Sequence, residues 1–102
     1  MNRLKTIEQL IEKYPMIPES AVITLVEYRD RGCPTGGFLE AVLSNDLMKA
    51  LASADDISVN ILLHYGRFIY NDLPMSAHGS PDRYKSWLMI GGLNSKEEIS
   101  PL

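Results

Sequence analysis

Apolar residues recur at helical spacing in five segments of this chain, and proline, glycine and short polar residues separate the segments. The first segment covers residues 3–14, where apolar side chains stand three or four positions apart, and Pro15 and Pro18 interrupt the pattern after it. The period resumes after Pro18, which suits the first turn of a helix, and stops at Gly32, which suits a helix C-cap. The pattern therefore predicts one helix over residues 3–14 and a second over about residues 18–32.

Three more helices are predicted over about residues 37–54, 56–72 and 81–90. The last has the clearest boundaries, because Ser80 suits an N-cap and Gly91 suits the end of a helix. The sequence thus indicates an all-α fold, a compact bundle of about five helices.

A chain of 102 residues has room for one hydrophobic core, so we expect a single domain over residues 1–92. Residues 93–102 are mostly polar, and we expect them to form a flexible C-terminal tail unless a partner holds them.

The helix predicted over residues 56–72 is apolar on more than one side, which is typical of a central helix or of one in a subunit interface. A row of polar residues lies between its apolar faces. We call it the polar row; it consists of Asn60, His64, Arg67 and Asn71. Steps of four, three and four residues stack these side chains on one face. The row offers amide, imidazole and guanidinium donors for a phosphate, a carboxylate or a protein partner, with Tyr70 beside it for stacking; the alternative is a solvated helix face.

Composition and charge exclude several classes of function. The formal net charge is -3, so the chain has no general attraction for nucleic acid or for an anionic membrane surface. No apolar run approaches the length of a membrane span, and the N-terminus lacks the apolar segment of a signal peptide. Cys33 is the single cysteine, which excludes an internal disulfide and fits a reducing, cytoplasmic compartment.

The glycine-rich turn before residue 38 is a candidate anion site. Thr35, Gly36 and Gly37 lead into a predicted helix, whose first backbone N–H groups lack partners within the helix. The turn lacks the lysine and the spacing of a mononucleotide-binding loop. The alternative interpretation is a tight turn between helices, with Thr35 or Gly36 as the cap.

A polar interruption of the helix over residues 37–54 is the third candidate. Asn45 and Asp46 follow a serine in a segment whose apolar period is otherwise regular, and all three residues favour caps over helix interiors. These polar residues have two alternative explanations: a contact with a ligand, or a local cap at a kink in the helix.

Metal and nucleophile chemistry are disfavoured. His64 and His78 are the two histidines of the chain, and no clustered carboxylate spacing accompanies them. Cys33 has no partner histidine at a recognisable spacing. We therefore expect no cofactor, no metal and no enzymatic activity.

Half of the chain resembles a family of short phage and prophage proteins of unknown function. The matching stretches are Gly-x-Pro-x-Gly-Gly-Phe-Leu-x-Ala-Val-Leu-Ser-Asn-Asp-Leu over residues 32–47, Ala-Ser-Ala-Asp over 52–55, Tyr-Asn-Asp-Leu-Pro over 70–74 and Gly-Ser-Pro over 79–81. The family pattern often has an aromatic residue where this chain has His78. The resemblance implies a phage accessory protein in the cytoplasm of a bacterial host, with host defence evasion as its setting, and it brings no known activity.

These observations favour a non-enzymatic binding protein that works as a homo-oligomer and sequesters a small anionic, nucleotide-like ligand. That hypothesis requires the polar row and the turn at residues 35–37 to share an enclosed space, inside one protomer or between two. A modulator of a host or phage enzyme, acting by protein–protein contact, is the alternative. A helix-turn-helix regulator is a further alternative, which the acidic charge balance disfavours.

Overall fold

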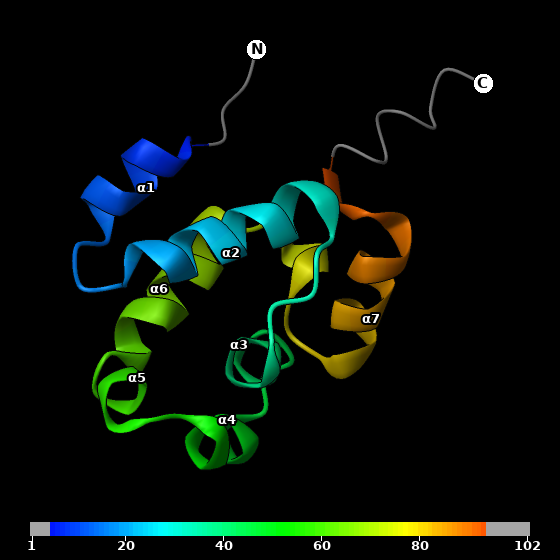
Figure 1. Cartoon of the computed structure of the whole chain (residues 1–102). Helices are drawn as coiled ribbons and strands as arrows, with labels where there is room; N and C mark the ends of the chain where they lie inside the picture. Colours follow the sequence, from blue (N-terminus) through cyan, green and yellow to red (C-terminus); the bar gives the residue numbers. More distant parts are fainter. Residues whose placement is uncertain (1–4, 94–102) are drawn as a thin grey trace.

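The computed structural model of the protein describes residues 5–93, and every regular element in that range is helical (Figure 1). The elements are α1 (Ile7–Lys13), α2 (Glu19–Arg31), α3 (Gly37–Leu43), α4 (Leu47–Ser53), α5 (Asp56–Asn60), α6 (Leu62–Asp72), a 3-10 turn η1 (Met75–Ala77) and α7 (Pro81–Ile90). The all-α prediction is confirmed, but the predicted count of about five helices is wrong. Two of the predicted helices are each broken in two.

The first break lies between α3 and α4. Asn45 has a φ of 62°, in the left-handed region, and therefore cannot continue a right-handed helix. Asp46 then caps α4, because its side chain accepts a hydrogen bond from the backbone N–H of Lys49 at 3.1 Å. The three cap-favouring residues thus end one helix and start the next.

The second break, at Ile61, has no comparable signal in the sequence. Ile61 has a φ of -112° and a ψ of 18°, and its N–H bonds back to Ser58 in a tightened last turn of α5. The side chain of Ile61 is buried, whereas no residue of α5 is buried and Ile57 is 68% exposed. The break lets Ile61 enter the core while α5 stays at the surface.

Several predicted helix ends are confirmed. Gly32 and Gly91 adopt the left-handed conformation and cap α2 and α7. The hydroxyl of Ser80 accepts a hydrogen bond from the N–H of Arg83 at 3.1 Å and caps the start of α7. The first helix covers Ile7–Lys13 and not the predicted residues 3–14, because Thr6 forms a capping box at its start; residues 3 and 4 of the predicted range lie outside the described residues.

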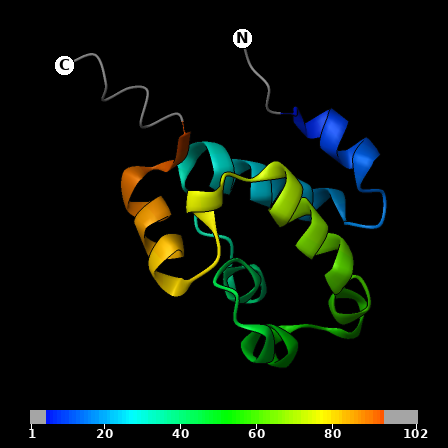
Figure 2. The ribbon, with the colours of Figure 1, turned by 180° about the vertical axis from the view of Figure 1, so that it is seen from behind.

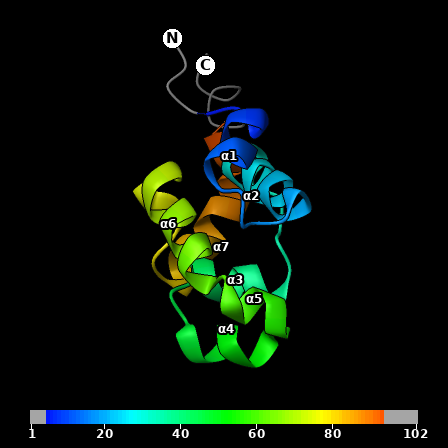
Figure 3. The same cartoon turned by 90° about the vertical axis from the view of Figure 1, so that its left-hand side faces the viewer.

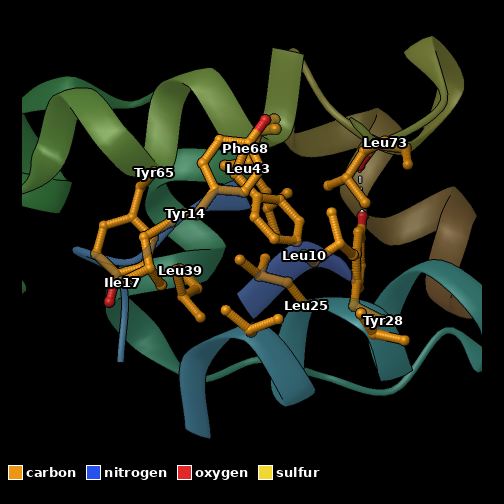
Figure 4. Packing of buried hydrophobic residues seen from close by; sticks show 14 of the residues in the cluster. Leu10, Tyr14, Ile17, Leu25, Tyr28, Leu39, Leu43, Tyr65, Phe68 and Leu73 are labelled. Carbon is orange, nitrogen blue, oxygen red and sulfur yellow. Dashed lines mark hydrogen bonds between the residues drawn. The ribbon is translucent and has the colours of Figure 1, made fainter. Parts of the chain in front are cut away.

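The main core cluster takes buried apolar side chains from every helix except α4 and α5, and the buried residue of α4, Ala50, lies outside this cluster. Figure 4 shows its centre, where Phe68 of α6 lies against Tyr14, with ring centroids 5.0 Å apart. The labelled residues come from segments far apart in the sequence: Leu10, Tyr14, Ile17, Leu25, Tyr28, Leu39, Leu43, Tyr65, Phe68 and Leu73.

The helices are arranged around α3. It contacts α4, α6 and α7, while α1 packs on α2. In Figures 1, 2 and 3 alike, α4 lies at the end of the molecule away from α1. Because α4 packs mainly on α3, most of its apolar surface remains uncovered.

The predicted C-terminal tail lies outside the described residues, apart from Leu93. That residue is partly buried and packs against the core cluster. Within residues 5–93, no helix combines the length and the apolar character that a bilayer crossing requires.

Candidate functional site

An open groove of about 380 Å³ lies between the α3–α4 corner and α6, and the loop before α7 also lines it. Its walls are mostly apolar. The lining residues are Val42, Asn45, Asp46, Leu47, Ala50, Leu62, Gly66, Ile69, Tyr70, His78 and Gly79. Cavities of this size are typical of sites that accept a small ligand or a few side chains of a partner.

The α3–α4 corner supplies the polar part of the groove. The N–H of Asn45 bonds to Val42 at 3.1 Å, and the N–H of Asp46 bonds to the carbonyl of Ala41 at 2.9 Å, so the corner is held by the end of α3. Both side chains are exposed. The corner therefore presents an amide and a carboxylate at the rim from a fixed backbone.

The α6 wall has a gap at Gly66. A Cβ atom at this position would have no heavy atom within 4 Å, and the backbone there is ordinary right-handed helix. Leu62 and Ile69 flank the gap, and Tyr70 stands at its edge with 81% of its surface exposed. Another backbone can therefore come closest to α6 at Gly66.

His78 and Gly79, in the loop before α7, also line the groove. The N–H of Gly79 donates to the carbonyl of Leu43 at 2.8 Å, which ties the loop to the end of α3. The Nε2 atom of His78 is buried and has no hydrogen-bond partner among the described residues. Burial lowers the pKa of the His78 imidazole below 6.5, and the positive charge of Arg83 lowers it further. The imidazole is therefore neutral at pH 7.

The electrostatic character of the groove follows from these side chains. Of the described residues that line it, Asp46 alone carries a formal charge at neutral pH. An apolar wall with one carboxylate favours an apolar guest that carries positive charge, and it disfavours an anion.

The polar row lies elsewhere, on the outer face of α6 and at the end of α5. Asn60, Arg67 and Asn71 are exposed, His64 is half-buried, and none of them lines the groove. Within one protomer the row and the turn at residues 35–37 therefore do not share the groove. Only the form of the ligand hypothesis in which the ligand lies between two protomers remains open, and the turn takes no part in it.

Two large apolar side chains accompany the row on α6. Leu63 is 63% exposed, and with Arg67 and Tyr70 it forms one line at helical spacing. We define the outer face of α6 as Leu63, His64, Arg67, Tyr70 and Asn71. It combines a guanidinium with uncovered aliphatic and aromatic surface.

The glycine-rich turn has partners within the protein. The N–H of Thr35 donates to the hydroxyl of Tyr84 at 3.3 Å, which attaches the turn to α7. Gly36 has a φ of 93°, a conformation that favours glycine, and its carbonyl accepts the N–H of Glu40 in α3. Gly37 is exposed at the first position of α3. The turn thus has a structural role as the cap between α2 and α3.

The ten sequence-predicted site residues therefore fall into three places. Asn45, Asp46 and Tyr70 line the groove; Thr35, Gly36 and Gly37 form the turn; and the four members of the polar row lie outside both. Sequence reasoning did not select His78, Gly79 or Gly66 as site residues. Two local signals are visible: a glycine at position 66 within an otherwise apolar helix, which lets another backbone come close, and a histidine directly before the Gly79–Ser80 cap. The contact of Gly79 with Leu43 is long-range and leaves no local signal.

The described residues hold no metal-ligating cluster. No group of three or more histidine, cysteine, aspartate or glutamate side chains in residues 5–93 is arranged to bind a metal ion. Cys33 is a half-buried free thiol.

Comparison with known proteins gives no family model, no curated protein and no solved structure that matches this chain.

Proposed function

We propose that this protein is a non-enzymatic binding protein that self-associates through the outer face of α6 and holds a small anionic ligand between protomers. The observation that carries the proposal is the exposure of Leu63 and Tyr70, at 63% and 81%, on either side of Arg67. Tyrosine and arginine are the residue types that most often dominate binding energy at protein interfaces. The exposed aliphatic and aromatic surface beside Arg67 favours contact with another protein surface, because such a contact removes the apolar surface from water.

The position of Arg67 links self-association to an anion. Arg67 is the central residue of α6 (Leu62–Asp72). Most homo-oligomers contain two-fold contacts, in which the same surface of both copies meets. If two α6 helices cross near their midpoints about a two-fold axis, the two Arg67 guanidinium groups lie close together and repel each other. An anion between them would remove the repulsion.

The neighbouring side chains suit a nucleotide-like anion. A guanidinium binds phosphate oxygens through two parallel hydrogen bonds, and His64 offers a further donor one turn away. The exposed ring of Tyr70 can stack on a base. With the resemblance to phage proteins, the concrete candidate is a nucleotide signal of the bacterial host, sequestered in the cytoplasm.

The test combines light scattering with calorimetry against a panel of mononucleotides and cyclic nucleotides. The wild-type protein is expected to bind one class of nucleotide and to be at least dimeric when the nucleotide is bound. Arg67→Ala removes both the repulsion and the anion contact, so it is expected to lose nucleotide binding and any effect of the nucleotide on the oligomeric state. Lys85→Ala is the matched control, because Lys85 is also an exposed cation but lies on α7. A protein that stays monomeric and takes up no nucleotide would refute the proposal.

A further inference from the structure

Apart from Tyr70, which lines its edge, the groove beside Gly66 is not used by the proposed function, and its chemistry differs from that of the outer face of α6. We infer that this groove is a docking site for an amphipathic helix of another protein, one that carries lysine or arginine beside its apolar face. The inference rests on the shape, the apolar walls and the charge of the groove.

The apolar walls account for the hydrophobic part of the partner. Val42, Ala50, Leu62 and Ile69 line the groove, and Leu47 extends it outward with 58% of its surface exposed. An open apolar groove of about 380 Å³ matches a few large side chains spaced along one face of a helix. Burial of these side chains would remove the apolar surface of the guest helix and that of the groove walls from water.

The fold favours a helix over an extended segment as the partner. Addition of a strand requires a sheet edge with free backbone groups, and residues 5–93 contain no strand. Helices α4 and α6 form the walls instead, and α6 with its 11 residues is about 16 Å long. A guest helix of three turns matches that length.

Gly66 marks the line of closest approach. A Cβ atom there would have no neighbour within 4 Å, so the absence of a side chain leaves open space in the α6 wall. Small residues at such positions let helix backbones approach closely. A large side chain at this position would fill the groove from inside.

Charge selects the kind of helix. Asp46 alone among the described lining residues is charged, and its Oδ1 atom caps α4. Residues 37–63, which include the α3–α4 corner, carry four carboxylates, from Glu40, Asp46, Asp55 and Asp56, against the single amine of Lys49, although only Asp46 lines the groove. The guanidinium of Arg83 lies beside His78 and Gly79 and donates to the carbonyl of His78 at 3.2 Å, so the attraction for a cation is confined to the α3–α4 corner. The exposed ring of Tyr70 adds a face that attracts a cation. A second copy of the chain that presented this same face would bring the carboxylates of both copies together, which disfavours it as the occupant.

The experiment uses two synthetic 16-residue helical peptides as probes, with the same leucine face and either lysine or glutamate on the flanks. Fluorescence anisotropy measures their binding to the wild type and to four variants. We expect the lysine peptide to bind about tenfold more tightly than the glutamate peptide. Gly66→Leu is expected to weaken binding of the lysine peptide by at least about tenfold.

Two variants and one control separate the causes. Asp46→Asn keeps an N-cap and removes the charge, so it should reduce the preference for lysine over glutamate. Gly37→Leu is the matched control, because Gly37 also has no neighbour within 4 Å of a built Cβ atom but does not line the groove. It should bind both peptides as the wild type does.

Three outcomes would overturn the inference. Equal binding of the two peptides refutes the charge assignment, and binding that Gly66→Leu leaves unchanged refutes the groove. Self-association that Gly66→Leu abolishes, without peptide binding, identifies a second copy as the occupant. Arg67→Ala, the fourth variant, should bind the lysine peptide as the wild type does. Failure of nucleotide binding at the outer face of α6 can therefore be told apart from failure of peptide binding in the groove.

Discussion

The backbone of Gly92 packs directly on the backbone of Gly32, where the chain leaves α7 and α2. A Cβ atom at Gly92 would lie 2.6 Å from the nitrogen of Gly32, and one at Gly32 would lie 2.9 Å from the nitrogen of Gly92. Both residues also have positive φ angles, of 75° and 69°. The two glycines let the end of α7 rest on the end of α2 at a distance that no other residue permits.

Gly92→Ala is therefore expected to destabilise the fold by at least about 2 kcal/mol, because the methyl group meets backbone atoms that cannot move aside. Gly66→Ala is the matched control and should stabilise the protein by up to about 1 kcal/mol, since alanine favours a helix and its methyl group has free space. Urea unfolding followed by circular dichroism measures both changes. Equal effects of the two substitutions would contradict the close packing of Gly92.

The Tyr28 hydroxyl joins α2 to the 3-10 turn η1. It donates a 2.6 Å hydrogen bond to the carbonyl of Ala77, a residue with no exposed surface. Tyr28→Phe should cost about 1–3 kcal/mol of the free energy of unfolding, because a buried carbonyl loses its partner. Tyr70→Phe is the control, and its exposed hydroxyl should contribute less than about 0.5 kcal/mol. A Tyr28→Phe protein as stable as the wild type would show that water replaces the hydroxyl.

Two substitutions of Asp46 separate its role as the N-cap of α4 from its proposed role in binding. Asp46→Ala removes the hydrogen bond to the N–H of Lys49 and should cost about 1 kcal/mol. Asp46→Asn retains an acceptor at the same place and should cost much less. Thermal unfolding of the two variants checks the difference, and equal losses of stability would mean that the charge, not the hydrogen bond, stabilises α4.

The His78 imidazole gives the stability of the fold a dependence on pH. Burial first, and the charge of Arg83 second, lower the pKa of His78 from 6.5, so the folded protein favours the neutral ring. As the pH falls, the unfolded chain binds the proton before the folded protein does. The free energy of unfolding should therefore be highest above pH 6.5 and should decline as the pH falls from there through the folded-state pKa.

His78→Gln should flatten this decline between about pH 7 and pH 5.5, a range above that in which most carboxylates titrate. Urea unfolding at a series of pH values measures it. An unchanged slope in His78→Gln would assign the dependence to another group.

The sequence predicts the local structure well because the signals of helix ends are local. Ser80, Gly32 and Gly91 cap helices as their residue types indicate, and the β-branched run in α2 is helical because its apolar period fits the core. The broken helix at Asn45 also has local causes. The break at Ile61 does not, since it depends on which residues of that segment reach the core.

The parts of the site that the sequence did not predict depend on contacts between distant residues. The sequence indicates Asn45, Asp46 and Tyr70 only as single residues, whereas the groove they share is also lined by Gly79, whose N–H bonds to the carbonyl of Leu43 at the end of α3. Arg29 shows the opposite case. The helical period of Val22, Leu25 and Val26 places position 29 on the buried face of α2, and its guanidinium is buried there, where it binds Asp30 and the carbonyl of Lys5.

The most direct test of the account is a native mass spectrum of the protein purified from its host cells, compared with that of Arg67→Ala. The expected wild-type spectrum is that of a multimer that carries additional mass from a small anionic ligand, and the spectrum of Arg67→Ala is expected to lack this added mass. A monomer without added mass, identical in the two proteins, would contradict the proposal that the outer face of α6 is a binding surface.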